Sequence, residues 1–381
     1  MSLLLFFLSL VLALAQLPPV SIYNITIPSA PSPNLSLATF TTPSTLLSIL
    51  SKPKVHPINT TVFDWWYFDA VSSSNPNVSV VITLFTSTPT AFPFLPSSNP
   101  SSVLLSYIWI SLANGTSYAA YTNASLATVD AVCGVTRGIW HGSGVSFTGS
   151  EEGAYEIVID GGLGVTGSMR LSSVRHPPAY QDKLKVANPH TPCGDNRLRL
   201  GDTGSTGAVG IGWASLLPDA EASVDVLVGG ARVRFTGVGY HDKNWSDGPF
   251  EAAVRTWYWG RGRVGPFSVV WFDMLPLGND TEVVSGYVAA GREVIVSGCE
   301  EGVVSVRPWK NGMAAAYPPV LGDVPDGFRV VYSDGMEVDV TLGAMVAGDG
   351  KYYARWTGTL TAKMEGEVYE GVGIFEQFVM Q

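Results

Sequence analysis

The second half of this chain is a succession of short β-type runs separated by turn residues. Each run is rich in Val, Ile, Thr or aromatic residues, and Gly, Asn, Asp or Pro commonly stands between neighbouring runs. This pattern predicts an antiparallel sheet that closes into a barrel, and a barrel of about eight or more strands can hold one small ligand. The eleven runs are Gly210 to Leu216, Ala222 to Val228, Ala231 to Tyr240, Glu251 to Gly260, Phe267 to Leu275, Val283 to Ala290, Glu293 to Ser297, Phe328 to Ser333, Met336 to Leu342, Tyr352 to Met364 and Glu367 to Phe378.

The first half carries the same signals, so the fold class is predicted to be all-β. The 381 residues include 41 Gly and 25 Pro, and only 14% of them are charged, which argues against long helices. That length allows two domains or one large β domain. We assign residues 58–207 to an N-terminal β-sandwich or barrel and residues 208–381 to a C-terminal β-barrel. The runs of the first half are Thr61 to Val71, Val78 to Thr86, Val103 to Ala113, Ser117 to Thr122, Ala154 to Asp160 and Leu163 to Val174.

Two segments are predicted to lie outside these sheets. Residues 175–207 contain several Pro and Gly residues, which favours an interdomain loop or lid. Residues 16–57 are rich in Pro, Ser and Thr, which favours an extended surface arm with one short helical turn near Ser44 to Leu50.

The N-terminus has the features of a secreted protein. Residues 1–15 form a short apolar run that ends in small residues, as in a signal peptide, and the run is too short to span a bilayer comfortably. We therefore expect entry into the secretory pathway and no stable membrane span in the mature chain. An eighth glycosylation motif at Asn244 lies within a polar cluster and is expected to be unmodified. The motifs expected to carry glycans are at Asn24, Asn34, Asn59, Asn77, Asn114, Asn123 and Asn279.

Charge and cysteine content exclude several classes of partner. The net charge of −10, with scattered Lys and Arg, disfavours nucleic acid and favours a neutral, apolar ligand. The three cysteines, Cys133, Cys193 and Cys299, permit at most one internal disulfide and are not spaced as a zinc site. No phosphate loop, dinucleotide fingerprint, nucleophile elbow or metalloprotease helix is present. The oligomeric state stays open.

The densest polar cluster is Gly237 to Asp247, and it contains Tyr240, His241, Lys243 and Asn244. Buried polar groups need partners, so such a cluster is either a structural network or a site. In the functional interpretation these four side chains donate hydrogen bonds at a cavity mouth. In the structural interpretation Asp242 and Asn244 hold a strand-to-turn corner and Trp245 closes the barrel end.

Two aromatic strands are candidates for the cavity wall. Strand alternation places Trp65 and Tyr67 on one face and Trp66 and Phe68 on the other. The same rule places Trp257 and Trp259 together and Tyr258 opposite. Rigid aromatic walls suit a flat or polyene ligand, although plain packing explains these residues equally well. We expect the working surface where Gly237 to Asp247 meets these two strands.

Four short motifs resemble the fungal Diels-Alderase family, whose members are lipocalin-like and related to hydroxyneurosporene synthase. They are Trp66-Tyr67-Phe68-Asp69, Gly138-Ile139-Trp140, Gly239-Tyr240-His241-Asp242-Lys243-Asn244-Trp245 and Tyr369-Glu370-Gly371-Val372-Gly373. The resemblance implies two β domains, the second a lipocalin-like antiparallel barrel, with an apolar polyketide or terpenoid ligand between or within them. It also implies a pericyclase of secondary metabolism that needs no metal and no organic cofactor.

The resemblance favours one reaction and leaves three others open. The leader and glycosylation motifs favour the branch that performs an intermolecular hetero-Diels-Alder addition. That reaction joins a tropolone-type quinone methide to a sesquiterpene alkene and gives a meroterpenoid dihydropyran. The alternatives are an intramolecular Diels-Alderase that forms a decalin or isoindolone, a polyene hydratase, and a secreted carrier.

The candidate residues divide into two sets. A cycloaddition requires orientation and carbonyl polarisation rather than net proton transfer, so hydrogen-bond donors are the catalytic candidates. If the quinone methide forms in the pocket by loss of water, His241 or Asp64 would serve as acid or base. The catalytic candidates are His241, Lys243, Tyr240, Asn244 and Arg261. The substrate-binding candidates are Asp64, Trp65, Trp66, Tyr67, Trp257, Tyr258, Trp259 and Phe272.

Overall fold

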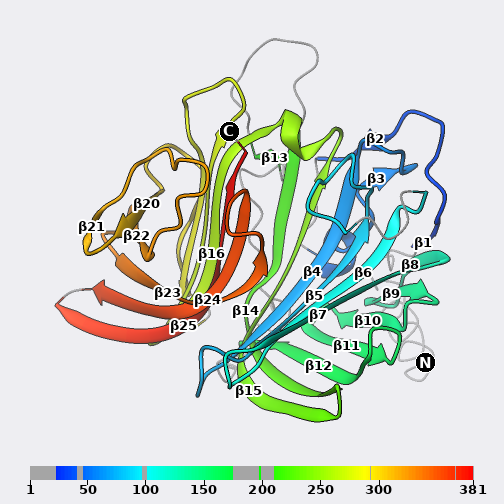
Figure 1. The fold of residues 1–381 in the computed structure, drawn as a ribbon, viewed down its shortest axis with the longest axis horizontal. Coiled ribbons are helices and arrows are strands. Elements are labelled where there is room, and N and C mark those ends of the chain that lie inside the picture. The colour runs from blue at the N-terminus through cyan, green and yellow to red at the C-terminus, as the bar shows by residue number, and fades with distance from the viewer. Residues whose placement is uncertain are drawn as a thin grey trace, which may run out of the picture.

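The chain folds almost entirely into β-strands, which confirms the all-β prediction (Figure 1). The computed structural model describes residues 23–40, 46–96, 101–174, 197–198, 210–291, 293–364 and 366–380. Two large antiparallel sheets and one two-stranded sheet contain all the described strands. The predicted signal peptide and most of the predicted loop at 175–207 lie outside the described residues.

The first sheet has thirteen strands and is built from the first two thirds of the chain. Its order is β1-β8-β9-β10-β11-β12-β14-β15-β4-β5-β6-β7, and β13 pairs with β14. The strands are β1 (Tyr23–Pro28), β4 (Phe63–Ser72), β5 (Ser79–Thr86), β6 (Leu104–Ser111), β7 (Ser117–Asn123), β8 (Leu126–Val132), β9 (Val135–His141), β10 (Val145–Ser150), β11 (Ala154–Asp160), β12 (Val165–Ser173), β13 (Arg197–Leu198), β14 (Ile211–Val228) and β15 (Ala231–Ser246).

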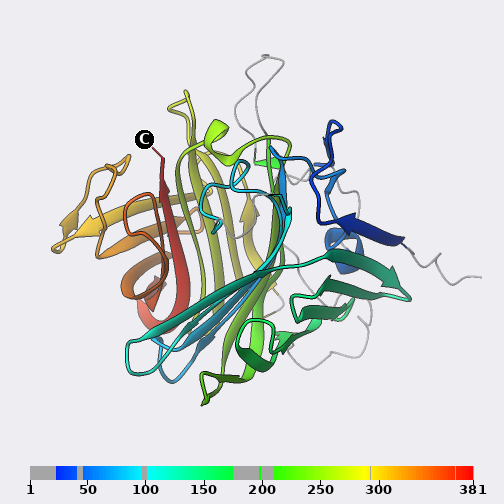
Figure 2. The ribbon, with the colours of Figure 1, turned by 45° about the vertical axis from the view of Figure 1, so that its right-hand side comes forward.

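The second sheet has ten strands in the order β19-β18-β17-β16-β25-β24-β23-β22-β20-β21. Figures 1 and 2 show it, in yellow to red, beside the blue to green strands of the first sheet. The strands are β16 (Val254–Val264), β17 (Phe267–Pro276), β18 (Val283–Ala290), β19 (Glu293–Gly298), β20 (Val304–Lys310), β21 (Met313–Ala314), β22 (Gly327–Tyr332), β23 (Glu337–Gly348), β24 (Tyr353–Met364) and β25 (Glu367–Val379).

The chain passes from one sheet to the other between Ser246 and Val254, later than the boundary expected at 207–208. The runs expected as separate strands at 210–216 and 222–228 form the single long strand β14. Its pairing with β15 shifts register between Ser215 and Leu217 and again between Leu217 and Ala220. A strand tolerates a proline at such an irregularity, so Pro218 bends β14 without ending it.

Three hydrophobic cores follow from strand alternation. One face of β4 sends Trp66 and Phe68 into a core enclosed by the first sheet. The second sheet encloses its own core, which contains Tyr258. The other face of β4 sends Trp65 and Tyr67 into a third core that both sheets share. The expected division of these side chains between faces is confirmed.

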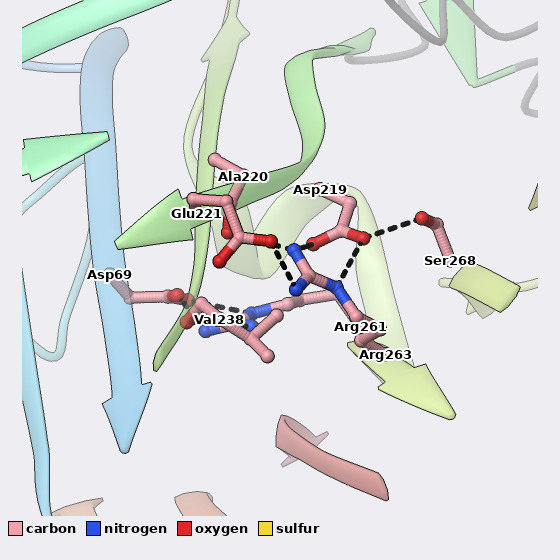
Figure 3. A network of polar contacts seen from close by, with 8 residues as sticks. All are labelled: Asp69, Asp219, Ala220, Glu221, Val238, Arg261, Arg263 and Ser268. Carbon is pink, nitrogen blue, oxygen red and sulfur yellow. Dashed lines mark hydrogen bonds and ion pairs between the residues drawn. The ribbon is translucent and has the colours of Figure 1, made fainter. Parts of the chain in front are cut away.

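A polar network also joins the two sheets beside the shared core (Figure 3). Arg261 of β16 forms an ion pair with Asp69 of β4, and both side chains are fully buried. Arg263 forms a bidentate ion pair with Asp219 of β14, with both distances at 2.8 Å. Ser268 of β17 donates to the same carboxylate at 2.6 Å. Moving the sheets apart would break these pairs and leave buried charges uncompensated, so the network holds one sheet against the other.

The N-terminal arm is held more tightly than its composition suggests. β1 pairs with β8, and β2 (Leu37–Ala38) pairs with β3 (Val55–His56). The predicted helical turn is the short helix α2 (Leu47–Leu50), whose first amides donate to Glu151. A 3-10 turn, η3 (Phe250–Ala252), precedes β16. Cys299 is disulfide-bonded, and Cys133 is an exposed free thiol. No helix among the described residues is long and apolar enough to cross a membrane.

Candidate active site

A narrow, aromatic-lined cavity lies between the two sheets, and the empty space within it, including space open to solvent, is about 570 Å³. Both sheets and the loop after β5 contribute to it. Residues of Gly237 to Asp247 and of both aromatic strands, where the working surface was expected, line this cavity. The lining residues are Trp65, Tyr67, Thr83, Phe85, Phe92, Phe94, Leu95, Tyr107, Trp109, Asp242, Asn244, Trp257, Trp259, Tyr353, Arg355, Glu376 and Phe378.

Strand register explains why these side chains meet. In the first sheet, Asp242 of β15 lies opposite Tyr67 of β4, which lies opposite Thr83 of β5 and then Tyr107 of β6. Residues directly opposite each other on neighbouring strands project from the same face of the sheet. Asn244, Trp65 and Phe85 form a parallel row two residues along.

The second sheet presents two matching rows. Trp259 of β16 lies opposite Glu376 of β25, which lies opposite Arg355 of β24. Trp257, Phe378 and Tyr353 form the neighbouring row. The cavity therefore has one polar band, in which Asp242 on the first sheet and the Arg355–Glu376 pair on the second lie among aromatic rings.

Aromatic side chains pack closely against one another in the part of the cavity wall that the loop after β5 contributes. Phe92, in the loop after β5, packs on Trp65 with ring centroids 4.9 Å apart and on Phe250 at 5.2 Å. Phe94 packs on Phe378 at 5.1 Å. Such close packing leaves little free volume around each ring, so a bulky ligand would have to displace some of these side chains.

Asp242 is a carboxyl of the cavity whose acidity is altered by its surroundings. Its Oδ2 accepts hydrogen bonds from Trp213 Nε1 at 2.9 Å and from Tyr240 Oη at 3.0 Å. Burial raises the pKa of Asp242 to about 7, and the negative charges of Glu376 and Asp69 add to the rise. Its Oδ1 has no hydrogen-bond partner among the described residues. At neutral pH this carboxyl is therefore protonated in a large fraction of molecules and can donate a hydrogen bond or a proton into the cavity.

Arg355 and Glu376 form the second polar element. Three donors converge on Glu376 Oε2: Arg355 Nε at 2.9 Å, Arg355 Nη2, and Tyr353 Oη at 3.3 Å. Burial raises the pKa of Glu376, and the guanidinium opposes the rise. The convergence of three donors on one oxygen favours the ionised carboxylate. The guanidinium also lies 4.7 Å from the centroid of the Tyr67 ring.

The structure places the predicted catalytic residues in three different surroundings. Asn244 lines the cavity. Tyr240 is fully buried just behind it and donates to Asp242. Arg261 is also behind the wall, where it binds Asp69, which in turn accepts a hydrogen bond from Tyr67 Oη at 2.6 Å. Tyr240 and Arg261 therefore contact cavity residues and do not line the cavity themselves.

His241 points away from the cavity, into the core of the first sheet. Its ring stacks on Phe68, with centroids 4.0 Å apart and an interplanar angle of 13°. Nδ1 lies 2.8 Å from the backbone oxygen of Tyr67 and is the donor in the neutral ring. Burial lowers the pKa of His241 to about 3, so the imidazole is neutral at physiological pH.

Lys243 shares that core and is paired. Its Nζ donates to Asp64 Oδ1 at 2.6 Å and lies 3.1 Å from the centroid of the Trp66 ring. Asp64 Oδ2 also accepts the amide of Lys54 at 2.6 Å. Burial lowers the pKa of Lys243 to about 8, although Asp64 opposes the change. This arrangement satisfies the buried charges within the first sheet, on the face opposite the cavity.

Some of the remaining predicted ligand-binding residues line the cavity, and the others lie behind its wall or in the separate cores of the two sheets. Trp65, Tyr67, Trp257 and Trp259 line the cavity. Trp66 and Tyr258 do not, because alternation turns them into the separate cores of the first and second sheets. Phe272 supports the cavity from behind, with its ring 4.3 Å from that of Trp257.

The predicted strand-to-turn corner at 242–244 is wrong. β15 continues to Ser246, and its pairing with β4 extends from Gly237 to Ser246 without a register shift. The stretch stays extended because protein packs on both faces of the strand, and the buried Asp242, Lys243 and Asn244 each form a hydrogen bond within the protein. Trp245 is buried in the core of the first sheet.

Sequence reasoning missed Arg355 and Glu376, and it assigned Asp242 to a turn. A signal for the missed pair exists, since each is the one charged residue in a short stretch of mainly apolar residues, Tyr353-Ala354-Arg355-Trp356 and Ile374-Phe375-Glu376-Gln377-Phe378. An ionisable residue in a buried strand requires a partner or a function. Pairing them with each other, however, requires the register of β24 on β25.

The chemistry available in the cavity is therefore acid or hydrogen-bond assistance to a neutral, apolar molecule. Aromatic faces can stabilise positive charge that develops in such a molecule. Among the described residues, no cluster of three or more His, Cys, Asp or Glu side chains is arranged to hold a metal ion.

The sequence matches a family model and several known proteins. The Diels-Alderase-like family model matches residues 36–300. The quinolone epoxide rearrangement protein asqO of Emericella nidulans is 34% identical over 342 residues, which cover 86% of this chain and 87% of that protein. The protein penF of Penicillium thymicola, with the same description, is also 34% identical over 342 residues. The Diels-Alderase cheD of Chaetomium globosum is 26% identical over 57% of this chain and 47% of its own length.

Solved structures agree on the fold. The crystal structure of CghA with Sch210972 superposes with a TM-score of 0.70, at 14% identity, over 94% of this chain and 98% of the other. Kievitone hydratase from Nectria haematococca gives a TM-score of 0.54 at 12% identity, over 93% and 98% of the two chains. These likenesses confirm the lipocalin-like two-domain β fold. Since the family model covers more than half of the sequence, the chain belongs to the Diels-Alderase-like family.

Proposed function

We propose that this chain is a cofactor-independent enzyme that rearranges a neutral epoxide in the cavity between the sheets, with Asp242 as the acid. The observation that carries the proposal is the raised pKa of Asp242, about 7, in a carboxyl whose Oδ1 is unpartnered and which lines an aromatic cavity. The relatives named quinolone epoxide rearrangement proteins support the same reaction class.

The proposed reaction is an isomerisation in which every atom is retained. The Asp242 carboxyl protonates the epoxide oxygen as one C–O bond breaks, which leaves a carbocation on the adjacent carbon. A substituent then migrates with its electron pair to that carbon, and the protonated carbonyl that results returns its proton to the Asp242 carboxylate. Trp65, Tyr67, Trp257 and Trp259 provide the aromatic faces that stabilise the cation, and positioned acid catalysis contributes about 10²- to 10⁴-fold in rate.

A second candidate is a [4+2] cycloaddition. Family membership and the relatives named Diels-Alderase support a pericyclase. In this reaction Asp242 would keep its proton and polarise a heterodiene carbonyl by a hydrogen bond, while the cavity holds the two reacting parts together. The hetero-Diels-Alder addition of a tropolone-type quinone methide to a sesquiterpene alkene is the specific form that we propose for this candidate. Passage through the secretory pathway remains part of that proposal.

One experiment separates the candidates. Purified full-length protein is incubated with trans-stilbene oxide, and separately with an ortho-quinone methide and a sesquiterpene triene, and products are identified by NMR. Epoxide rearrangement predicts diphenylacetaldehyde from the first incubation, lost in Asp242→Asn. The cycloaddition would be supported instead if the protein speeds the formation of a single dihydropyran stereoisomer in the second incubation, relative to a reaction without protein, and if Asp242→Asn keeps this rate. An alcohol formed from the triene and labelled from oxygen-18 water would indicate a hydratase, and binding without product a carrier.

A further inference from the structure

The cavity contains a buried cation with an unused hydrogen-bond donor. Arg355 is 9% exposed and lines the cavity from β24. Its Nε and Nη2 bind Glu376, whereas Nη1 has no partner among the described residues. A buried donor without a partner is costly, so the free Nη1 indicates a place for an oxygen of a ligand.

The surroundings of Arg355 hold the guanidinium in one orientation. The Tyr67 ring lies 4.7 Å from it, the Tyr353 ring 5.7 Å and the Trp109 ring 5.8 Å. Glu376 fixes its opposite edge. A planar group held in this way presents its remaining N–H groups in a set direction, which favours recognition over simple charge attraction.

The charges around Arg355 indicate which kind of oxygen it takes. Glu376 already balances the positive charge of the guanidinium, and Asp242 lines the same cavity from the facing sheet. A ligand carboxylate would bring a further negative charge close to these two carboxyl groups. A neutral carbonyl oxygen accepts the same hydrogen bond without that repulsion.

We propose that Arg355 Nη1 binds a neutral carbonyl oxygen of the substrate, of the lactam or conjugated-ketone type, while Asp242 faces the oxygen that reacts. The substrate therefore carries two separate oxygen functions, one directed to each sheet, on an otherwise apolar frame. This inference rests on the proposed function only in taking the cavity as the substrate site. It adds a specificity-determining residue and a substrate class, whichever reaction follows.

The test is a binding measurement that does not depend on turnover. Carbostyril, a lactam, is compared with quinoline, which has the same rings without the carbonyl, and with the carboxylate quinaldate, by isothermal titration calorimetry on the full chain. Wild-type protein is expected to bind carbostyril about tenfold more tightly than either analogue. The double variant Arg355→Met/Glu376→Gln, which leaves no unpaired buried charge, is expected to bind carbostyril and quinoline equally.

A second variant tests the charge argument by a gain of affinity. Glu376→Gln removes the balancing charge, so quinaldate affinity is expected to rise about tenfold, an effect that a purely structural role of the pair does not produce. The matched control is Arg329→Met/Asp339→Asn, an exposed pair on β22 and β23, which should bind all three probes as the wild type does. Any one of three results would overturn the proposal. The first is that Arg355→Met/Glu376→Gln still prefers carbostyril to quinoline. The others are that the wild type binds quinaldate more tightly than carbostyril, or that it does not bind carbostyril. Loss of turnover in Asp242→Asn with the preference intact would leave it standing.

Discussion

Replacing Lys243 with Met tests whether the buried ion pair of the first sheet holds the fold together. The Nζ of Lys243 lies 2.6 Å from Asp64 Oδ1, and the two side chains are 0% and 1% exposed. Removing the lysine leaves the Asp64 carboxyl, among the described residues, with the hydrogen bond from the Lys54 amide and the attraction of the Lys54 ammonium. Breaking a buried pair in this way costs about 3–5 kcal/mol, because one group is left uncompensated.

The expected result is a free energy of unfolding lowered by about that amount, measured by urea unfolding with tryptophan fluorescence and circular dichroism. The double variant Asp64→Asn/Lys243→Met should recover most of the loss, because it buries no charge. Arg170→Met is the control, since its pair with Glu156 is exposed and contributes at most about 1 kcal/mol. If Lys243→Met unfolds within about 1 kcal/mol of the wild type, the pair is not structural and a role for Lys243 in chemistry would have to be reconsidered.

Three further predictions concern the parts around the cavity. Between pH 6.5 and 3, His241 is protonated in the unfolded chain but not in the folded chain, where its pKa is about 3, so the free energy of unfolding falls as pH falls through this window. His241→Phe should reduce the difference between the urea unfolding free energies at pH 7 and pH 4.5 by about 2–3 kcal/mol. An unchanged difference would contradict the neutral, buried ring. Arg261→Met should lower the melting temperature more than Arg255→Met, whose partner Asp280 is exposed, and equal shifts would argue against the buried pair with Asp69 as a link between the sheets. If the chain is secreted, mass spectrometry after glycosidase treatment should find a glycan at exposed Asn114 and none at buried Asn244, and a glycan at Asn244 would be incompatible with the pairing of β15.

The fold was largely predictable because strand alternation is a local signal. The opposed faces of Trp65–Trp66 and of Trp257–Tyr258 follow from period-two geometry alone, and both are confirmed. The domain boundary was expected at 207–208 because residues 175–207 contain several Pro and Gly residues, whereas the chain passes to the second sheet only after β15. β14 was expected as two strands because proline in an isolated sequence signals an end, but the strand continues through Pro218 with register shifts around Leu217.

The site was predictable only in part. The aromatic wall was found because bulky residues cluster locally, whereas the polar band joins Asp242 to Arg355 and Glu376, far apart in sequence. Their meeting depends on how two sheets face each other, which no local pattern encodes. His241 and Lys243 were predicted as catalytic because they are polar. Strand alternation, however, turns both side chains into the core of the first sheet, while Asp242, between them, faces the cavity.

A pH–rate profile is the sharpest test of the proposed role of Asp242 as the acid in the cavity. We expect kcat/KM for isomerisation of stilbene oxide to be constant at low pH and to fall as pH rises through about 7, because only the protonated carboxyl is active. Asp242→Asn should lower the rate by about 10²- to 10⁴-fold and abolish this pH dependence, with circular dichroism confirming the fold. A wild-type profile that is flat from pH 5 to 9, together with an Asp242→Asn rate within about twofold of the wild type, would contradict the assignment.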